Sequence, residues 1–141
     1  MSTEKKIAIT IETVVNAPVE KVWENWNAPE AIIKWNSAHP DWHTPWATND
    51  LRVGGKITSR MEAKDGSMGF DFGGTYDEVE LHKTIAYTLG DDRKVRITFT
   101  PEGNRTRVTE TFDAEDQNPH DMQRAGWQAI LDNFKSYTEQ S

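Results

Sequence analysis

The chain has 141 residues, close to the commonest size of a domain and long enough to bury about two-thirds of its unfolded surface. No linker-like or repetitive stretch divides it, so we expect residues 1–141 to form a single domain. Its 23 acidic and 16 basic residues give a net charge of −7, and the basic residues are scattered. This distribution argues against nucleic acids and anionic membranes as partners.

The absence of cysteine excludes disulfides, thiolate metal sites and a Cys nucleophile, and it fits a reducing compartment. Residues 1–6 lead into an alternating run rather than an apolar targeting segment, and no stretch of about 18 apolar residues occurs. We therefore expect a cytoplasmic protein. Six Trp, five Phe and three Tyr predict a core rich in aromatic side chains.

The first elements predicted in chain order are one strand and two short helices. Apolar and polar residues alternate over roughly 6–15, which is typical of a half-buried strand. Pro18 and the helical spacing of apolar residues over 19–26 then predict a short amphipathic helix. Pro29 restarts the pattern, which predicts a second helix of about two turns ending near Trp35.

A sheet and a covering helix follow. The segment 42–50 is too aromatic for an ordinary exposed loop, so we expect it to fold over the core as a lid. From Leu51 onward, turn residues recur about every ten positions and predict an antiparallel meander with one apolar face. A helix near 119–138, with Trp127 and Phe134 on one stripe, would cover that face.

The predicted fold class is therefore α+β. A curved antiparallel sheet receives two short helices after its first strand and carries a long C-terminal helix across it. Because side chains cannot fill all the space between a curved sheet and a helix, we also expect an internal cavity.

Four short motifs carry a resemblance to a known family. They are Ala17–Trp23, Gly54-Gly55, Gly73–Val79 and Gly126–Phe134. In this combination the chain resembles the activator-of-heat-shock-chaperone-ATPase homologue (AHSA-type) group of the START-like, helix-grip (SRPBCC) superfamily, over about residues 7–138. The resemblance implies the helix-grip fold. Members of the superfamily bind lipids or hormones, cyclise polyketides, sequester antibiotics or contact chaperones, so it implies no single activity.

The candidate ligand-binding residues are mainly aromatic, with a few polar or flexible side chains that could orient a ligand or adapt to it. They are Trp35, Trp42, His43, Trp46, Met61, Phe70, Phe72, Tyr76, Phe99, Glu110, Phe112, Met122 and Trp127.

The titratable candidates are two histidines and one glutamate. His39 and His43 have a helical metal-ligand spacing, but Pro40 disfavours a helix there and no third ligand is near, so we predict no metal site and no cofactor. His43 remains a candidate pocket donor or general base. Strand parity places Glu110 on the inward face, where a carboxylate needs a partner or takes a raised pKa.

Three interpretations of Glu110 stay open at this point. It could form a buried ion pair with Arg60, Arg96 or Arg124, it could act on a ligand, or a bulge could turn it outward.

Three functions follow from these observations. The leading hypothesis is a non-catalytic or weakly catalytic binder of a small hydrophobic or aromatic molecule. The alternatives are an enzyme of cyclase or hydratase type that uses an acid/base group in the same cavity, and a module that contacts a chaperone. A buried, unpaired Glu110 or His43 would favour the enzyme, whereas a closed interior with an exposed apolar patch would favour the chaperone module.

Overall fold

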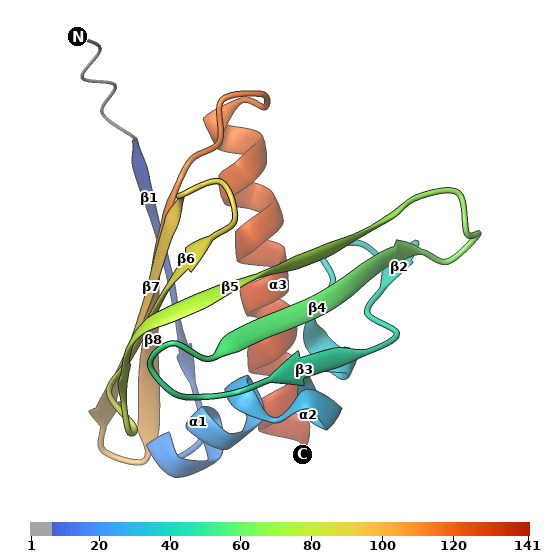
Figure 1. Ribbon diagram of the computed structural model, residues 1–141. Helices are drawn as coiled ribbons and strands as arrows, with labels where there is room; N and C mark the ends of the chain where they lie inside the picture. The colour runs from blue at the N-terminus through green and yellow to red at the C-terminus, as the bar shows by residue number, and fades with distance from the viewer. Residues whose placement is uncertain (1–6) are drawn as a thin grey trace, which may run out of the picture.

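A computed structural model describes residues 7–141 as a curved antiparallel sheet with one long helix across it (Figure 1). The predicted start of the first strand at residue 6, and the segment expected to carry no targeting signal, lie outside the described residues. The strands are β1 (Ala8–Val15), β2 (Trp42–His43), β3 (Ala47–Asn49), β4 (Lys56–Ala63), β5 (Gly69–Glu80), β6 (Thr84–Leu89), β7 (Lys94–Glu102) and β8 (Arg105–Asp113).

The strands form one sheet in the order β1-β8-β7-β6-β5-β4-β2, and β3 also pairs with β4. All of the pairings are antiparallel. Strands β4 to β8 follow one another as the predicted meander, and β1 adds to its far edge beside β8. The fold class is α+β with the helix-grip arrangement, as the sequence predicted.

Three helices cover the sheet: α1 (Val19–Asn27), α2 (Pro29–Trp35) and α3 (His120–Gln140). Ala28 is extended between the first two, because Pro29 lacks the N–H that would continue α1 and instead begins α2. Helix α3 runs along one face of the sheet, and α1 and α2 lie against one end of it (Figure 1). None of the helices within residues 7–141 is both long and apolar enough to cross a bilayer.

The core lies between the sheet and the three helices. Alternate residues of β7 and β8 are buried, which is the pattern of strands with one covered face. Aromatic rings join the helices to this face: Trp26 of α1 packs edge-on to Phe99 of β7 and to Phe134 of α3, with centroid distances of 5.9 and 4.8 Å. The aromatic-rich core expected from the composition is therefore present.

The segment 42–50 is not a lid. It forms β2 and β3, which pair with the outer edge of β4, with Trp42 opposite Ala63 and Ala47 opposite Ser59. The unpaired backbone groups of that edge provide partners for an extended segment, and the two short strands are separated around Pro45, which cannot donate a ladder hydrogen bond.

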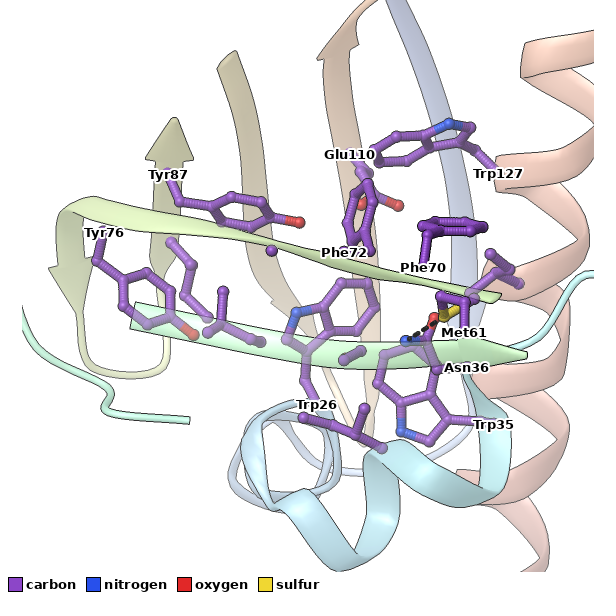
Figure 2. Close-up of a pocket in the computed structure, with 16 residues that line it drawn as sticks. Trp26, Trp35, Asn36, Met61, Phe70, Phe72, Tyr76, Tyr87, Glu110 and Trp127 are labelled. Atoms are coloured by element: carbon purple, nitrogen blue, oxygen red, sulfur yellow. Dashed lines mark hydrogen bonds between the residues drawn. The ribbon is translucent and has the colours of Figure 1, made fainter. Parts of the chain in front are cut away.

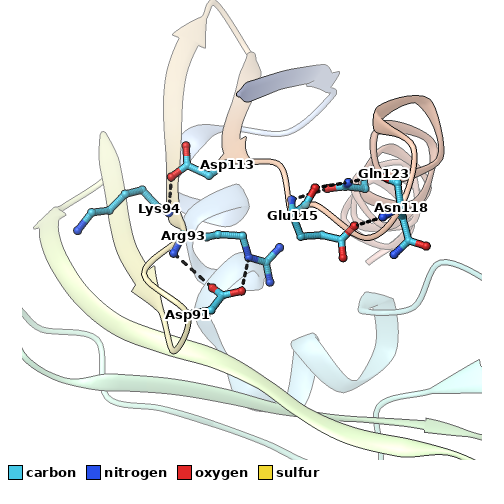
Figure 3. A network of polar contacts seen from close by, with 7 residues as sticks. All are labelled: Asp91, Arg93, Lys94, Asp113, Glu115, Asn118 and Gln123. Atoms are coloured by element: carbon cyan, nitrogen blue, oxygen red, sulfur yellow. Dashed lines mark hydrogen bonds and ion pairs between the residues drawn. The ribbon is translucent and has the colours of Figure 1, made fainter. Parts of the chain in front are cut away.

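Helix α3 begins at His120, within one residue of the predicted start, and no side-chain hydrogen bond caps it. Instead the buried side chain of Gln123 organises the preceding loop (Figure 3). Its Nε2 donates to the carbonyl oxygens of Glu115 and Asn118 at 3.0 and 2.8 Å, and its Oε1 accepts from the N–H of Glu115 at 2.9 Å.

Candidate functional site

A cavity of about 220 Å³ lies between the sheet and the helices (Figure 2). An engineered protein cavity of about 150 Å³ takes up benzene, so this volume accommodates a substituted ring. Phe70 is 50% exposed where it lines the cavity, which places the opening beside the outer ends of β4 and β5. The lining residues are Trp26, Ile32, Trp35, Asn36, Ile57, Ser59, Met61, Phe70, Phe72, Gly73, Tyr76, Ile85, Tyr87, Glu110, Trp127 and Ile130.

Strand β5 lies unusually close to its neighbours β4 and β6 where it lines the cavity. A Cβ atom on Gly73 would lie 1.9 Å from the carbonyl oxygen of Ile57, and one on Gly74 would lie 2.3 Å from that of Thr88. Both distances are far below van der Waals contact, so this close approach requires glycine at both positions. A register shift between Tyr76 and Glu78 then adds a bulge, which increases the local bend.

Helix α3 supplies the opposite wall through Trp127. Its ring stacks on Phe112 of β8 with centroids 3.9 Å apart and an angle of 8°, and Phe72 of β5 meets it edge-on at 5.8 Å. These contacts fix the indole in place at the boundary of the cavity. Phe112 itself is fully covered and lies behind Trp127 rather than in the wall.

Glu110 is the single charged residue among the described lining residues. It is 6% exposed, and no hydrogen-bond or ion-pair partner for it is found within residues 7–141. Burial raises its pKa from the ordinary 4.5 to about 8, because the cavity walls replace the water that would solvate the charge. The carboxyl group is therefore mostly protonated at neutral pH.

The arginines considered as partners of Glu110 are all engaged elsewhere. Arg60 pairs with Glu62 and Asp71 at 2.8 and 3.1 Å, and Arg96 pairs with Glu78 at 2.7 Å. Arg124 donates to the carbonyl oxygen of Thr10 at 2.7 Å. The ion-pair interpretation is therefore wrong, and so is the outward bulge, because Glu110 sits in a regular ladder.

Two tyrosines differ in how their hydroxyl groups are satisfied. The Tyr76 hydroxyl donates to Asn49 Oδ1 at 2.6 Å, and Asn49 Nδ2 donates to the Asn27 carbonyl at 2.8 Å. The Tyr87 hydroxyl makes no hydrogen bond to any described residue. Burial raises the pKa of Tyr87, and the nearby Glu110 and Tyr76 raise it further. Both hydroxyl groups are therefore neutral, and that of Tyr87 is available to a ligand.

The structure brings about half of the predicted site residues together. Those that line the cavity are Trp35, Met61, Phe70, Phe72, Tyr76, Glu110 and Trp127. The others lie outside it, and whether the first group binds a ligand stays a prediction.

The remaining predicted residues lie in three kinds of place. Phe99 and Phe112 are buried in the packed core. Trp42 stands outside the cavity and contacts Phe70 at 6.0 Å between centroids. His43, Trp46 and Met122 are displaced from the site: His43 Nε2 lies 3.9 Å from Glu62 Oε1, and Trp46 and Met122 are 45% and 60% exposed. His43 lies in β2 opposite Glu62 of β4, which keeps it out of the cavity lining.

Sequence reasoning missed several lining residues, above all Trp26, Ser59, Tyr87 and Ile130. Ser59 and Tyr87 lie on inward strand faces, so strand parity could have identified them. Among residues 7–141 no group of three or more His, Asp or Glu side chains is placed to hold a metal ion.

Three comparisons relate the chain to known proteins. Residues 16–139 match the family model described as "Activator of Hsp90 ATPase homolog 1-like protein". A search of curated proteins found no match. The chain is similar to the solution structure of an AHSA1-like protein from Aeromonas hydrophila, with 46% identity, a TM-score of 0.89 and coverage of 95% of this chain and 93% of that one.

Two further solved structures are similar. Protein Chr148 from Cytophaga hutchinsonii is 57% identical, with a TM-score of 0.82 and coverage of 94% of this chain and 92% of that one. Protein CV1439 from Chromobacterium violaceum is 26% identical, with a TM-score of 0.84 and coverage of 94% and 96%. Because the family model spans nearly the whole chain, and the fold and motifs agree with it, this protein belongs to the Activator of Hsp90 ATPase homolog 1-like family.

Proposed function

We propose that this chain is a cytoplasmic protein that binds a small, largely apolar molecule of one or two rings in the cavity between its sheet and helices. The observation that carries the proposal is the cavity itself, with aromatic walls and two polar groups that have no hydrogen-bond partner among residues 7–141. Apolar ligand pockets commonly combine such walls with a small number of orienting groups.

The polar groups support binding rather than simple packing. Glu110 and the hydroxyl of Tyr87 are buried beside the cavity and have no hydrogen-bond partner among residues 7–141. A bound molecule that accepts or donates hydrogen bonds at these groups would be oriented by them.

The proposal can be tested through three tryptophans, Trp26, Trp35 and Trp127, which line the cavity. We expect a panel of small ring compounds to include some that quench intrinsic fluorescence saturably and raise the melting temperature by mass action. Compounds larger than the cavity should do neither. A panel that gives no saturable response would contradict the proposal.

A pair of variants localises the binding. Ser59 is 3% exposed and lines the cavity, so Ser59→Leu should fill it and abolish quenching while leaving the melting temperature unchanged or higher. Thr58→Leu adds the same side chain on the other face of β4 and should bind like the wild type. Equal binding by both variants would place the ligand elsewhere.

A second function, acid/base catalysis on the same bound molecule, is favoured by one observation. Glu110 is buried and has no ion-pair partner in the described part of the chain, and burial raises its pKa to about 8, near the pH at which a general acid works efficiently. Once a ligand class is found, its turnover can be followed directly. Loss of turnover with retained binding in Glu110→Gln would support an enzyme of cyclase or hydratase type.

Contact with a chaperone, which the family description suggests, has less support from the geometry. Trp42, Met68 and Phe70 provide apolar surface near the β4–β5 turn, and Trp42 touches Phe70. Other exposed apolar side chains, such as Leu81 and Met122, belong to separate turns and helices. Co-purification with a chaperone that is lost on Phe70→Ser would support this alternative.

A further inference from the structure

The charge that a ligand can carry is restricted by the acidic group facing the cavity, and this restriction is stronger than the one set by the cavity's shape. Glu110 is a carboxyl group, and the described lining includes no Lys, Arg or His. An anionic ligand would lose its hydration without gaining an ion pair, and it would face a group of the same sign whenever Glu110 is ionised. A ligand carrying a positive charge would instead supply the counter-ion that Glu110 lacks.

The aromatic walls of the cavity also favour a positively charged ligand. The rings of Trp26, Trp35, Phe72, Tyr87 and Trp127 surround the space beside Glu110 (Figure 2). Aromatic faces carry partial negative charge and attract cations, most strongly when water is excluded. Several of these rings also pack against neighbouring rings, as Trp26 does against Phe134 with centroids 4.8 Å apart.

The surroundings of Glu110 determine how such binding would depend on pH. The residues opposite it on β1 and β7 are Ile11 and Ile97, and the nearest wall of α3 is formed by Trp127 and Ile130. The remaining side holds two titratable residues, Tyr87 of β6 and, beyond it, Tyr76 of β5. Burial raises the pKa of both tyrosines. Glu110 is therefore the group whose ionisation changes near neutral pH.

From this arrangement we infer that the cavity selects small organic cations, with the Glu110 carboxylate as counter-ion and the surrounding aromatic rings as walls. The inference rests on the proposed binding function and specifies its ligand class as ring-bearing ammonium compounds. Because Glu110 holds a proton in the empty cavity near neutral pH, cation binding releases that proton and becomes tighter as the pH rises toward about 8.

Three probes of nearly equal size test the charge preference: 2-phenylethylammonium, 2-phenylethanol and phenylacetate. We expect calorimetric or fluorescence titration at pH 8 to show the cation binding at least about tenfold more tightly than the alcohol, and the anion binding least. Equal or stronger binding of the alcohol would overturn the inference but preserve the binding function. No binding of any of the three would count against both.

Variants and pH give an independent test. Glu110→Gln should weaken the cation at least about tenfold at pH 8 and leave the alcohol within about threefold. Glu78→Gln removes the same charge from an exposed ion pair with Arg96 and should change neither probe. In the wild type, benzyltrimethylammonium, whose charge does not titrate, should bind more tightly at pH 8 than at pH 6. Affinity that stays constant or falls with pH would overturn the inference without relying on a variant.

Discussion

At the scale of single residues, the buried carboxyl group of Glu110 makes stability depend on pH. Its pKa is about 8 in the folded protein against an ordinary 4.5, so the folded state keeps a proton that the unfolded state releases between those values. The stabilisation is complete below about pH 4.5, and it decreases by up to about 1.4 kcal/mol per pH unit until the pH passes 8.

Glu110→Gln should remove this pH dependence of stability. The free energy of unfolding of the wild type should fall relative to that of the variant as the pH rises from 5 to 8, and the difference should then level off. Urea denaturation at a series of pH values measures both proteins directly. If the unfolding free energies of the two proteins changed with pH in parallel, the cavity would solvate Glu110 well enough to keep its pKa near the ordinary value.

The two buried tyrosines provide a matched pair. Tyr76→Phe removes the donor to Asn49 Oδ1, leaves that oxygen unpaired, and should cost about 1–2 kcal/mol of unfolding free energy. Tyr87→Phe removes a hydroxyl group that has no partner among residues 7–141, so it should be neutral or slightly stabilising. Thermal or urea denaturation compares them, and an equal loss in both variants would contradict this assignment.

Residue-level prediction from sequence succeeded where strand parity decides the outcome. The inward position of Glu110 followed from alternation along its strand, because consecutive side chains must point to opposite faces. The absence of an ion-pair partner could not be predicted in the same way. Arg60 and Arg96 find acidic neighbours on the outer face of the sheet, and those pairings depend on the register between β4, β5, β6 and β7.

At the scale of elements, the loop before α3 depends on one buried side chain. Gln123→Ala would remove three hydrogen bonds that hold residues 115–118 and should cost about 1–3 kcal/mol of unfolding free energy (Figure 3). Gln128→Ala, in the same helix, removes only exposed hydrogen bonds, to Asp132 Oδ1 at 2.9 Å and to the Glu12 carbonyl oxygen at 3.4 Å, and should cost no more than about 0.5 kcal/mol. Similar losses in both variants, measured by denaturation, would show that the Gln123 contacts contribute little.

Helices and strands were predictable from sequence where proline and turn residues mark their ends. Strands that form by pairing with the exposed edge of a sheet were not. Pro18 and Pro29 separate two short helices, and turn residues divide the meander, so these elements follow from local chemistry. The segment 42–50 has aromatic residues that would also suit a lid. Its strands pair with the edge of β4, and that tertiary pairing is not encoded in the local sequence of the segment.

At the scale of the whole molecule, the sheet has two unequal halves. Strands β7 and β8 bury alternate residues completely against the helices, whereas β4 and β5 are mostly only partly buried and line the cavity. The β4–β5 hairpin also extends beyond the helices toward its turn (Figure 1). Backbone hydrogen bonds open most readily where few apolar contacts hold them, so the two halves should differ in local stability.

Hydrogen exchange tests this difference and links it to binding. Amides of β4 and β5 should exchange faster than those of β7 and β8, since opening the cavity side breaks fewer buried contacts. A bound molecule, or the larger side chain of Ser59→Leu, should slow exchange in β4 and β5 while leaving β7, which contributes no residue to the cavity lining, nearly unchanged at early times. Uniform exchange across the sheet, or ligand protection confined to β7 and β8, would contradict the division. Faster exchange in β4 and β5 would then identify these two strands as the part of the sheet that opens to admit a ligand.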